Sequence, residues 1–351
     1  MSKYDRDRSL EKNVEFMTDP TKTGVLVRCG IGPVPLPPMY SLEKYNFPDD
    51  IKLYCDHIVA RSVEWEKAHS EVDDDWLPLL KPVLGHAIHS CFFGGGVVYA
   101  GGTSYPEHQL KDVTEWRTLK MDKNLPHYKI LLDGMEYMYE LCPKIGFYTT
   151  LRGCDGPMDL ANVVRGNDLL YDFYDEPEAT KEFMSFCADA VAWTFENQRQ
   201  FASKVAGGYF SGWDTFMPGF SLGHIAEDAT CFISPQTYEE FGIPYTNQLL
   251  EKYDYGYLHI HTISRVFIPY FLKLEKVGTF QIASDPNQPD SFEVYREYAH
   301  YFEGKVVHID ISAKKFLENL DFFNGKRTIV NVSTHSVEEA KRVVEAARSI
   351  D

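Results

Sequence analysis

Two histidines of this 351-residue chain, His259 and His261, are spaced so that their side chains could share one ligand. They end an apolar and aromatic stretch, Tyr255 to His261, that is typical of a buried strand. Side chains two residues apart on a strand project from the same face. The pair therefore indicates half of a metal site, although a buried, hydrogen-bonded histidine pair has the same spacing.

Acidic residues follow other predicted strands. Asp285 comes after the apolar segment 278–283, and Asp214 comes after the segment 207–213. Ligands gather at the carboxyl ends of parallel strands, so we expect both carboxylates on the rim of the cavity that holds the histidines. Asp214 could act as an acid there or orient another group.

Aromatic residues around Asp214 could line this cavity for a flat substrate. Tyr209, Trp213 and Phe216 are the predicted substrate contacts, in a set that also contains Phe210 and Phe220. Because the side chains of a strand alternate between its faces, we expect at least half of this set to belong to the core.

The elements that must position these residues alternate between strands and helices. Strand candidates lie near residues 25, 88, 147, 210, 258, 280, 307 and 330. Eight such units predict an α/β fold, namely a (β/α)8 TIM barrel. The chain shows neither a linker nor a short repeat, so we expect one domain over residues 1–351, with 1–23 as an N-terminal helical and loop extension.

Composition limits the classes of partner. A formal net charge of −17 argues against nucleic acid and anionic membranes. Seven scattered cysteines without a C-x-x-C pair indicate a reducing compartment. The sequence has neither an apolar signal core at its start nor a run of eighteen apolar residues. We therefore expect a cytoplasmic protein that binds neither nucleic acid nor membrane.

Several motifs occur in an order that resembles the uroporphyrinogen decarboxylase superfamily. They are GxxDLA (156–161) with a following Arg-Gly (165–166), Asp-Glu-Pro (175–177), Ser-Pro-x-x-Tyr-x-x-Phe-x-x-Pro (234–244) and the His-x-His of 259–261. The resemblance covers most of the chain from about residue 75, and most convincingly 145–286. It implies a (β/α)8 barrel whose active site lies at the carboxyl ends of the strands. The superfamily includes the decarboxylase and zinc-dependent, corrinoid-linked methyltransferases.

The chain departs from two branches of that superfamily. The arginine-rich motif of the decarboxylases is not found around 29–40. Coenzyme M methyltransferases carry His-x-Cys-Gly at this strand end and a second cysteine near the last strand, whereas this chain has His259-Ile-His261-Thr262 and, near its last strand, Ser333-Thr-His335. Zinc bound by imidazole and carboxylate is a stronger Lewis acid than thiolate-rich zinc, and it suits oxygen better than a thiol.

A zinc site needs a third protein ligand. Glu227 and Asp228 lie in the segment 223–228, which we expect to be a loop, where relatives bring acidic groups to the site. Glu227 is the first choice as the ligand. Glu240 is an alternative that more often would be a solvated helix residue, and His335 could equally be a surface residue at a helix cap.

The resemblance implies a methyltransferase that moves the methyl group of an aryl methyl ether onto Co(I) of a corrinoid. Zinc would activate the ether oxygen, with Asp214, Asp228 and Asp285 as candidate catalytic groups. The chain has no D-x-H-x-x-G motif for a corrinoid ligand, so the cobalamin must arrive on a partner protein. Two alternatives stay open: transfer from a methylcorrinoid to a thiol or tetrahydrofolate, and a metal-free small-molecule binding protein. A homodimer also stays open.

Overall fold

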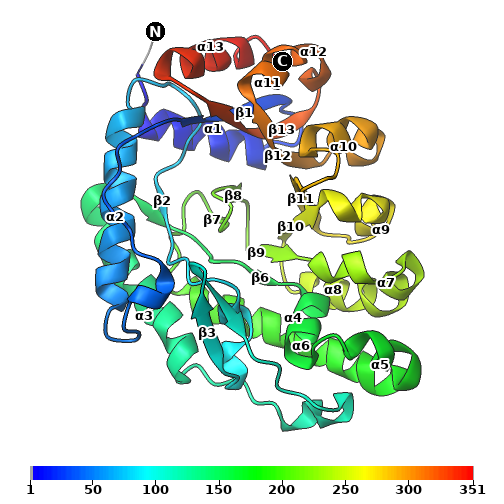
Figure 1. Cartoon of the computed structure of the whole chain (residues 1–351). Helices are drawn as coiled ribbons and strands as arrows, with labels where there is room; N and C mark the ends of the chain where they lie inside the picture. Colours follow the sequence, from blue (N-terminus) through cyan, green and yellow to red (C-terminus); the bar gives the residue numbers. More distant parts are fainter. Residues whose placement is uncertain (1–2, 351) are drawn as a thin grey trace.

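The computed structural model describes residues 3–350. A curved sheet of seven parallel strands forms its centre, with helices on the outer face (Figure 1). In sheet order the strands are β1 (Gly24–Ile31), β13 (Arg327–Thr334), β12 (Val306–Ser312), β11 (Val277–Ala283), β10 (Tyr255–His261), β9 (Ser221–Ala226) and β6 (Cys154–Asp155). Three two-stranded sheets accompany it: β2 (Leu79–Leu80) with β5 (Tyr148–Thr149), β3 (Val97–Ala100) with β4 (Thr103–Pro106), and β7 (Tyr209–Phe210) with β8 (Phe216–Met217).

Thirteen α-helices occur among the described residues. They are α1 (Arg6–Thr18), α2 (Ile51–His69), α3 (Pro126–Ile145), α4 (Pro157–Arg165), α5 (Leu169–Asp175), α6 (Pro177–Arg199), α7 (Pro235–Phe241), α8 (Ile243–Leu250), α9 (Ile268–Phe271), α10 (Ser291–Glu297), α11 (Ala313–Leu317), α12 (Leu320–Phe323) and α13 (Val337–Ala347). Proline in the first turn begins α6 and α7, and the Ser234 side chain caps α7 by accepting from the Thr237 N–H. These prolines belong to the Asp-Glu-Pro and Ser-Pro motifs of the sequence.

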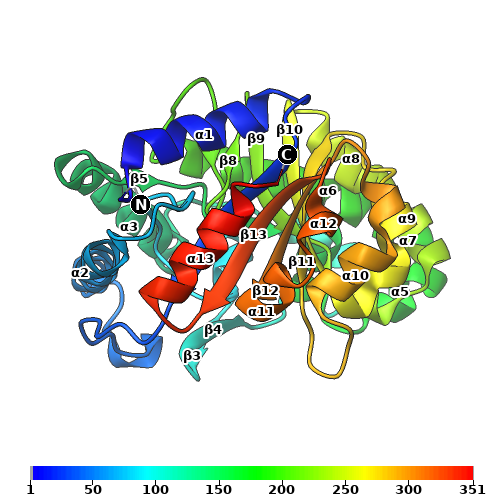
Figure 2. The ribbon, with the colours of Figure 1, turned by 90° about the horizontal axis from the view of Figure 1, so that it is seen from above.

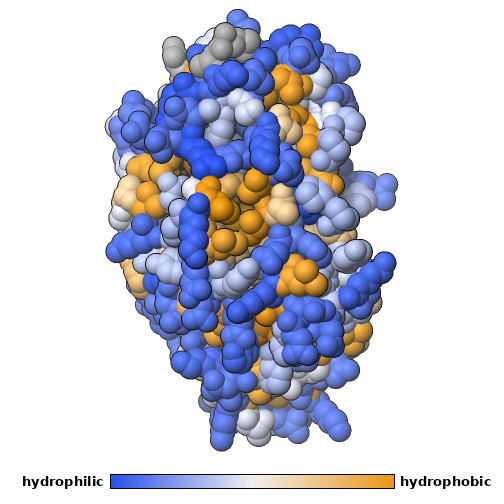
Figure 3. All heavy atoms as spheres, turned by 90° about the vertical axis from the view of Figure 1, so that its left-hand side faces the viewer, coloured by the Kyte–Doolittle hydropathy of each residue, from blue (hydrophilic) through white to orange (hydrophobic). Residues whose placement is uncertain are grey.

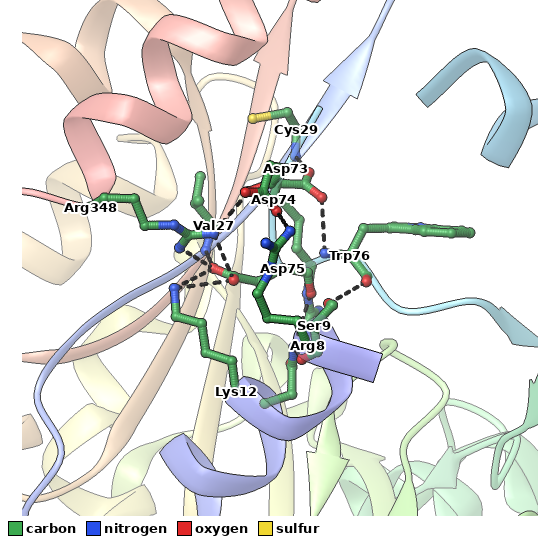
Figure 4. A network of polar contacts seen from close by, with 12 residues as sticks. Arg8, Ser9, Lys12, Val27, Cys29, Asp73, Asp74, Asp75, Trp76 and Arg348 are labelled. Atoms are coloured by element: carbon green, nitrogen blue, oxygen red, sulfur yellow. Dashed lines mark hydrogen bonds and ion pairs between the residues drawn. The ribbon is translucent and has the colours of Figure 1, made fainter. Parts of the chain in front are cut away.

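The α/β class agrees with the prediction, but the expected closed barrel does not appear, because the main sheet is open between β1 and β6. Side chains occupy the free edge of β1 (Figure 4). The Asp75 carboxylate accepts from the Val27 N–H at 2.8 Å, and the Asp74 carboxylate accepts from the Cys29 N–H at 2.7 Å. The backbone donors that a neighbouring strand would use are therefore already satisfied. The next strand, β2, pairs with β5 instead.

Two strand assignments from the sequence differ from the structure, and one strand was missed. The segment near residue 88 forms short 3-10 turns, and the strand expected over 207–213 contributes only β7, which folds back on β8. The main sheet instead contains β9, in the region that was expected to be a loop. Gly223 of β9 lies so close to the ring of Phe195 on α6 that a Cβ at this position would sit 2.0 Å from the ring. Close packing of α6 thus explains a glycine inside a strand.

Helix α1 covers the amino-terminal end of the sheet. Figure 2 shows α1 on one side of the strands and the β3–β4 hairpin on the other. Phe16 and Met17 of α1 join a buried apolar cluster with Leu26, Phe216 and Ile329. Helix α1, which lies in the expected N-terminal extension, therefore contributes to a buried cluster.

The face around α2 shows apolar side chains framed by hydrophilic ones (Figure 3). Leu53 on α2 and the loop residues Met39 and Val83 are exposed apolar residues. Among residues 3–350, no helix combines the length and the apolar character that crossing a bilayer requires.

Candidate functional site

The side chains of His259 and His261 point toward each other at the carboxyl end of β10. Their Nε2 atoms are 3.1 Å apart. The Nδ1 atom of His259 bonds to the Gln281 Oε1, and the Nδ1 atom of His261 bonds to the Asp285 Oδ1 at 2.7 Å. Both oxygens are acceptors, so both Nδ1 atoms donate, and in the neutral form of each ring the Nε2 atom presents a lone pair. Two lone pairs thus face one point, as the spacing predicted.

The carboxylate beside the two Nε2 atoms belongs to Asp228, whose Oδ1 lies 3.6 Å from the His261 Nε2. One donor atom each from Asp228, His259 and His261 lies within 4.8 Å of the others. Asp228 follows β9, the strand next to β10 in the sheet. The Asp159 carboxylate on α4 holds this turn by accepting from the N–H groups of Asp228 and Ala229, at 2.8 and 2.7 Å.

The structure does not bring Glu227, the first choice as third ligand, to the histidines. Its side chain is buried, and its Oε1 accepts from the Thr246 hydroxyl on α8 at 2.6 Å. Burial raises the pKa of Glu227 to about 8, so this group carries a proton at neutral pH. A protonated carboxyl that faces α8 is a poor metal ligand, whereas its neighbour Asp228 turns toward β10.

The protonation states of the other groups suit a cation. Burial, together with the adjacent His261, lowers the pKa of His259 to about 4, so its imidazole is neutral at pH 7. Burial raises the pKa of Asp228 to about 6, which leaves a carboxylate at neutral pH. Partial burial opposes ionisation of Asp285, but hydrogen bonds from the Ile263 N–H, His261 and Thr262 outweigh it and hold its pKa below the ordinary value.

Trp213 connects the histidine pair to a cavity. The indole stacks on the His259 ring with centroids 5.1 Å apart and planes inclined by 7°. It lies in the turn between β7 and β8, where the Ser211 hydroxyl accepts from the N–H groups of Trp213 and Thr215. Figure 1 shows this hairpin inside the curve of the sheet. Trp213 also lines a cavity of about 520 Å³.

A second cavity, of about 460 Å³, opens beside His261. His261, Asp228 and Asp285 line it, together with Asp155 and the exposed ring of Phe232. His261 and Asp285 thus line one cavity and Asp214 lines another, whereas the sequence predicted a single cavity for all of them.

Asp214, a predicted catalytic residue, lies at the 520 Å³ cavity and away from the ligand group. Its carboxylate pairs with the Lys81 ammonium at 2.7 Å, and its backbone has a φ of +56° in the hairpin turn. The residue therefore belongs to the cavity that Trp213 lines.

Of the three predicted substrate contacts, only Trp213 reaches a cavity. Tyr209 and Phe216 are buried, Phe216 completely, and neither lines the two cavities beside the histidines. Phe216 instead packs in the apolar cluster that α1 covers. The two other ligand candidates also lie elsewhere: His335 is exposed near α13, and exposed Glu240 pairs with Lys181.

Sequence reasoning missed the partner of His259, Gln281. Gln281 lies directly opposite His259 in the parallel pairing of β10 with β11. Both strands were predicted, so aligning them by their ends could have found this pair. Arg28, Arg152 and Lys81, which line the 520 Å³ cavity, were also missed. Arg28 and Arg152 lie at or just beyond predicted strands, whereas no strand was predicted at Lys81, and nothing in the spacing of the three indicated that they meet.

No protein-family model matches this chain, and no curated protein matches it. Among solved structures, the chain is similar to a methyltransferase from Methanosarcina mazei, with a TM-score of 0.58 and 9% sequence identity. The match covers 91% of this chain and 95% of that one. The two proteins share a fold along nearly their whole lengths.

Proposed function

We propose that this chain is a methyltransferase that transfers the methyl group of an aryl methyl ether to Co(I) of a corrinoid carried by a partner protein. The observation that carries the proposal is the 3.1 Å approach of the two Nε2 atoms beside the Asp228 carboxylate. The fold similarity to a methyltransferase supports the general class of reaction.

The donor set fits zinc. Two lone pairs 3.1 Å apart repel each other unless a cation or a proton lies between them, and two imidazoles with one carboxylate form a common catalytic zinc site. The bond from His261 to Asp285 and that from His259 to Gln281 fix both rings in the ligating tautomer. Bound zinc would supply Lewis acidity toward the ether oxygen, which develops negative charge as the methyl group leaves.

The chain's own residues would bind and orient the substrate. Trp213 presents a flat apolar surface beside His259, which suits an aromatic ring. The 460 Å³ cavity, which His261, Asp228 and Asp285 line, gives direct access to the candidate ligands. The 520 Å³ cavity reaches the histidine pair through Trp213.

An anaerobic assay with a Co(I) corrinoid protein tests the proposal. Addition of an aryl methyl ether should convert the Co(I) spectrum to that of methylcobalt in the presence of the chain. The His261→Ala variant should fail, whereas His335→Ala, which changes an exposed histidine outside the site, should behave as the wild type. An unchanged cobalt spectrum with every methyl ether tried would refute the proposal.

A further inference from the structure

The 520 Å³ cavity is positively charged inside a strongly acidic protein. Arg28, Lys81 and Arg152 line it against a single carboxylate, Asp214, while the chain as a whole has a formal charge of −17. His224 also lines it and adds no charge, because burial and the nearby Arg152 lower its pKa well below the usual range. A local excess of cations in such a protein indicates a site for an anion.

The two arginines lack the partners that buried guanidinium groups normally have. Arg28 is buried on β1, and its side chain makes one hydrogen bond, to the Asn13 Oδ1 at 3.1 Å, with no carboxylate in ion-pair contact among the described residues. The Arg152 side chain has neither a hydrogen bond nor an ion pair within residues 3–350. Nε of each group is buried and unsatisfied. Arg28 is buried and Arg152 is half-buried. An unpaired charge in a protein interior is costly, so an anionic ligand would stabilise both groups.

Aromatic rings also line this cavity, and one of them lies next to the proposed reaction centre. Trp65, Trp76 and Trp213 contribute to the walls. Trp213 stacks on His259, so a ring held in this cavity lies one indole away from the histidine pair. Planar guanidinium groups match the geometry of a carboxylate, and indole rings match a flat aromatic ring.

We infer that this cavity binds an aromatic carboxylic acid, with the carboxylate at Arg28 and Arg152 and the ring between the indoles. The inference deepens the proposed function and rests on it: the methyl donor is a methoxylated aromatic acid rather than a neutral ether. Arg28 and Arg152 are then the residues that determine substrate specificity.

Tryptophan fluorescence of the full chain measures binding, because three of its five tryptophans line the cavity. Benzoate and 4-methoxybenzoate should bind at least about tenfold more tightly than anisole. Arg152→Gln should reduce this preference at least about tenfold relative to anisole, because the carboxylate loses one of its two guanidinium partners. Arg152→Lys should restore part of the preference. The control Arg61→Gln changes a half-buried arginine that bonds to the Pro37 carbonyl outside this cavity, and it should have no effect.

Equal binding of benzoate and anisole would overturn the inference. So would a signal from inorganic phosphate that benzoate does not displace, because the site would then take a small anion. If Arg152→Gln fails to fold, Lys81→Gln provides the same comparison. It also removes a cation from the cavity, and it leaves the Asp214 carboxylate without its partner. The cobalt assay separates the two claims. Equal turnover of anisole and 4-methoxybenzoate would leave the methyltransferase and remove the acid specificity. Arg152-dependent binding of acids without methyl transfer would leave the acid site and remove the methyltransferase.

Discussion

His259 and His261 illustrate how much one strand can determine at the level of single residues. Alternation along β10 places both imidazoles on one face, and the next strand and its following loop supply an acceptor for each Nδ1. The ring orientation is therefore fixed before any ligand binds. Such preorganisation is what a catalytic metal site requires of the groups behind its ligands.

Replacement of either histidine should remove the metal. We expect about one zinc per chain in the wild type, and near-complete loss in His259→Ala and in His261→Ala, because each leaves too few ligands. Elemental analysis of the purified proteins measures this, with exposed His335→Ala as the matched control. Full zinc content in the double variant would rule out the site.

Loss of a ligand and loss of the aromatic wall should affect different kinetic constants. Charge develops on the ether oxygen only in the transition state, so His261→Ala should lower kcat at least about a hundredfold. Trp213→Leu should mainly raise KM, because ring stacking stabilises the ground state and the transition state alike. Steady-state rates with phenyl ethers of graded leaving-group acidity test both. Tyr171→Leu, an exposed ring on α5, is the control. Turnover that depends neither on the phenol pKa nor on metal would contradict this account.

At the scale of elements, the sequence predicts the strands that are long and apolar. The segments that form β1, β10, β11, β12 and β13 were recognised because buried parallel strands form continuous apolar runs. β9 was missed because Ser221-Leu-Gly-His-Ile-Ala contains a glycine that only the packing of α6 explains. Without the end of this strand, the sequence could not show which of the two neighbouring carboxylates faces β10. In the structure Glu227 bonds to Thr246 on α8, and Asp228 lies beside the histidines.

The edge of β1 depends on two carboxylates, and we expect Asp75 to matter most. Its side chain accepts from the Val27 N–H and pairs with Lys12 and Arg348 (Figure 4). Asp75→Ala leaves a buried backbone donor and two cations without their partner, and should cost about 3 kcal/mol of unfolding free energy. Urea denaturation measures it. The control Glu11→Ala removes an exposed carboxylate from α1. If Asp75→Ala lowered the unfolding free energy no more than Glu11→Ala does, Asp75 would not stabilise the edge of β1.

His308 on β12 makes the free energy of unfolding depend on pH. This side chain is buried and bonds to the Tyr257 hydroxyl at 2.8 Å, and burial lowers its pKa to about 3. In the unfolded chain its pKa is about 6.5, so unfolding takes up a proton between these values. Its contribution is complete above about pH 6.5 and is lost toward pH 3, at about 1.4 kcal/mol per pH unit.

Denaturation of wild type and His308→Gln between pH 7 and pH 4 tests this dependence. The unfolding free energy of the variant should fall less steeply with acid than that of the wild type. His300→Gln, an exposed histidine, should keep the wild-type slope. Parallel curves for wild type and His308→Gln would contradict the assignment.

At the scale of the whole molecule, the two terminal helices cover the free edge of the main sheet at β1. Arg348, just beyond α13, and Lys12 of α1 meet at Asp75, so both terminal helices are bound to the free edge of β1. The polar composition of the N-terminal segment did not reveal this arrangement, because an extension that makes no such contacts has the same composition. The available signal was the pair of apolar residues Phe16 and Met17 in an otherwise polar segment.

The closing role of α1 leads to a prediction that separates stability from chemistry. Phe16 is buried against Leu26, Phe216, Val306 and Ile329 at the amino-terminal end of the strands, whereas the histidines lie at their carboxyl ends. Phe16→Ala should cost about 3 kcal/mol of unfolding free energy through the lost burial and the cavity left behind. Zinc content should stay at the wild-type level under native conditions. Phe232→Ala, an exposed phenylalanine, should cost little. Because no bond to the ligands or their acceptors involves α1, loss of zinc in folded Phe16→Ala would show that the two ends of the sheet are coupled.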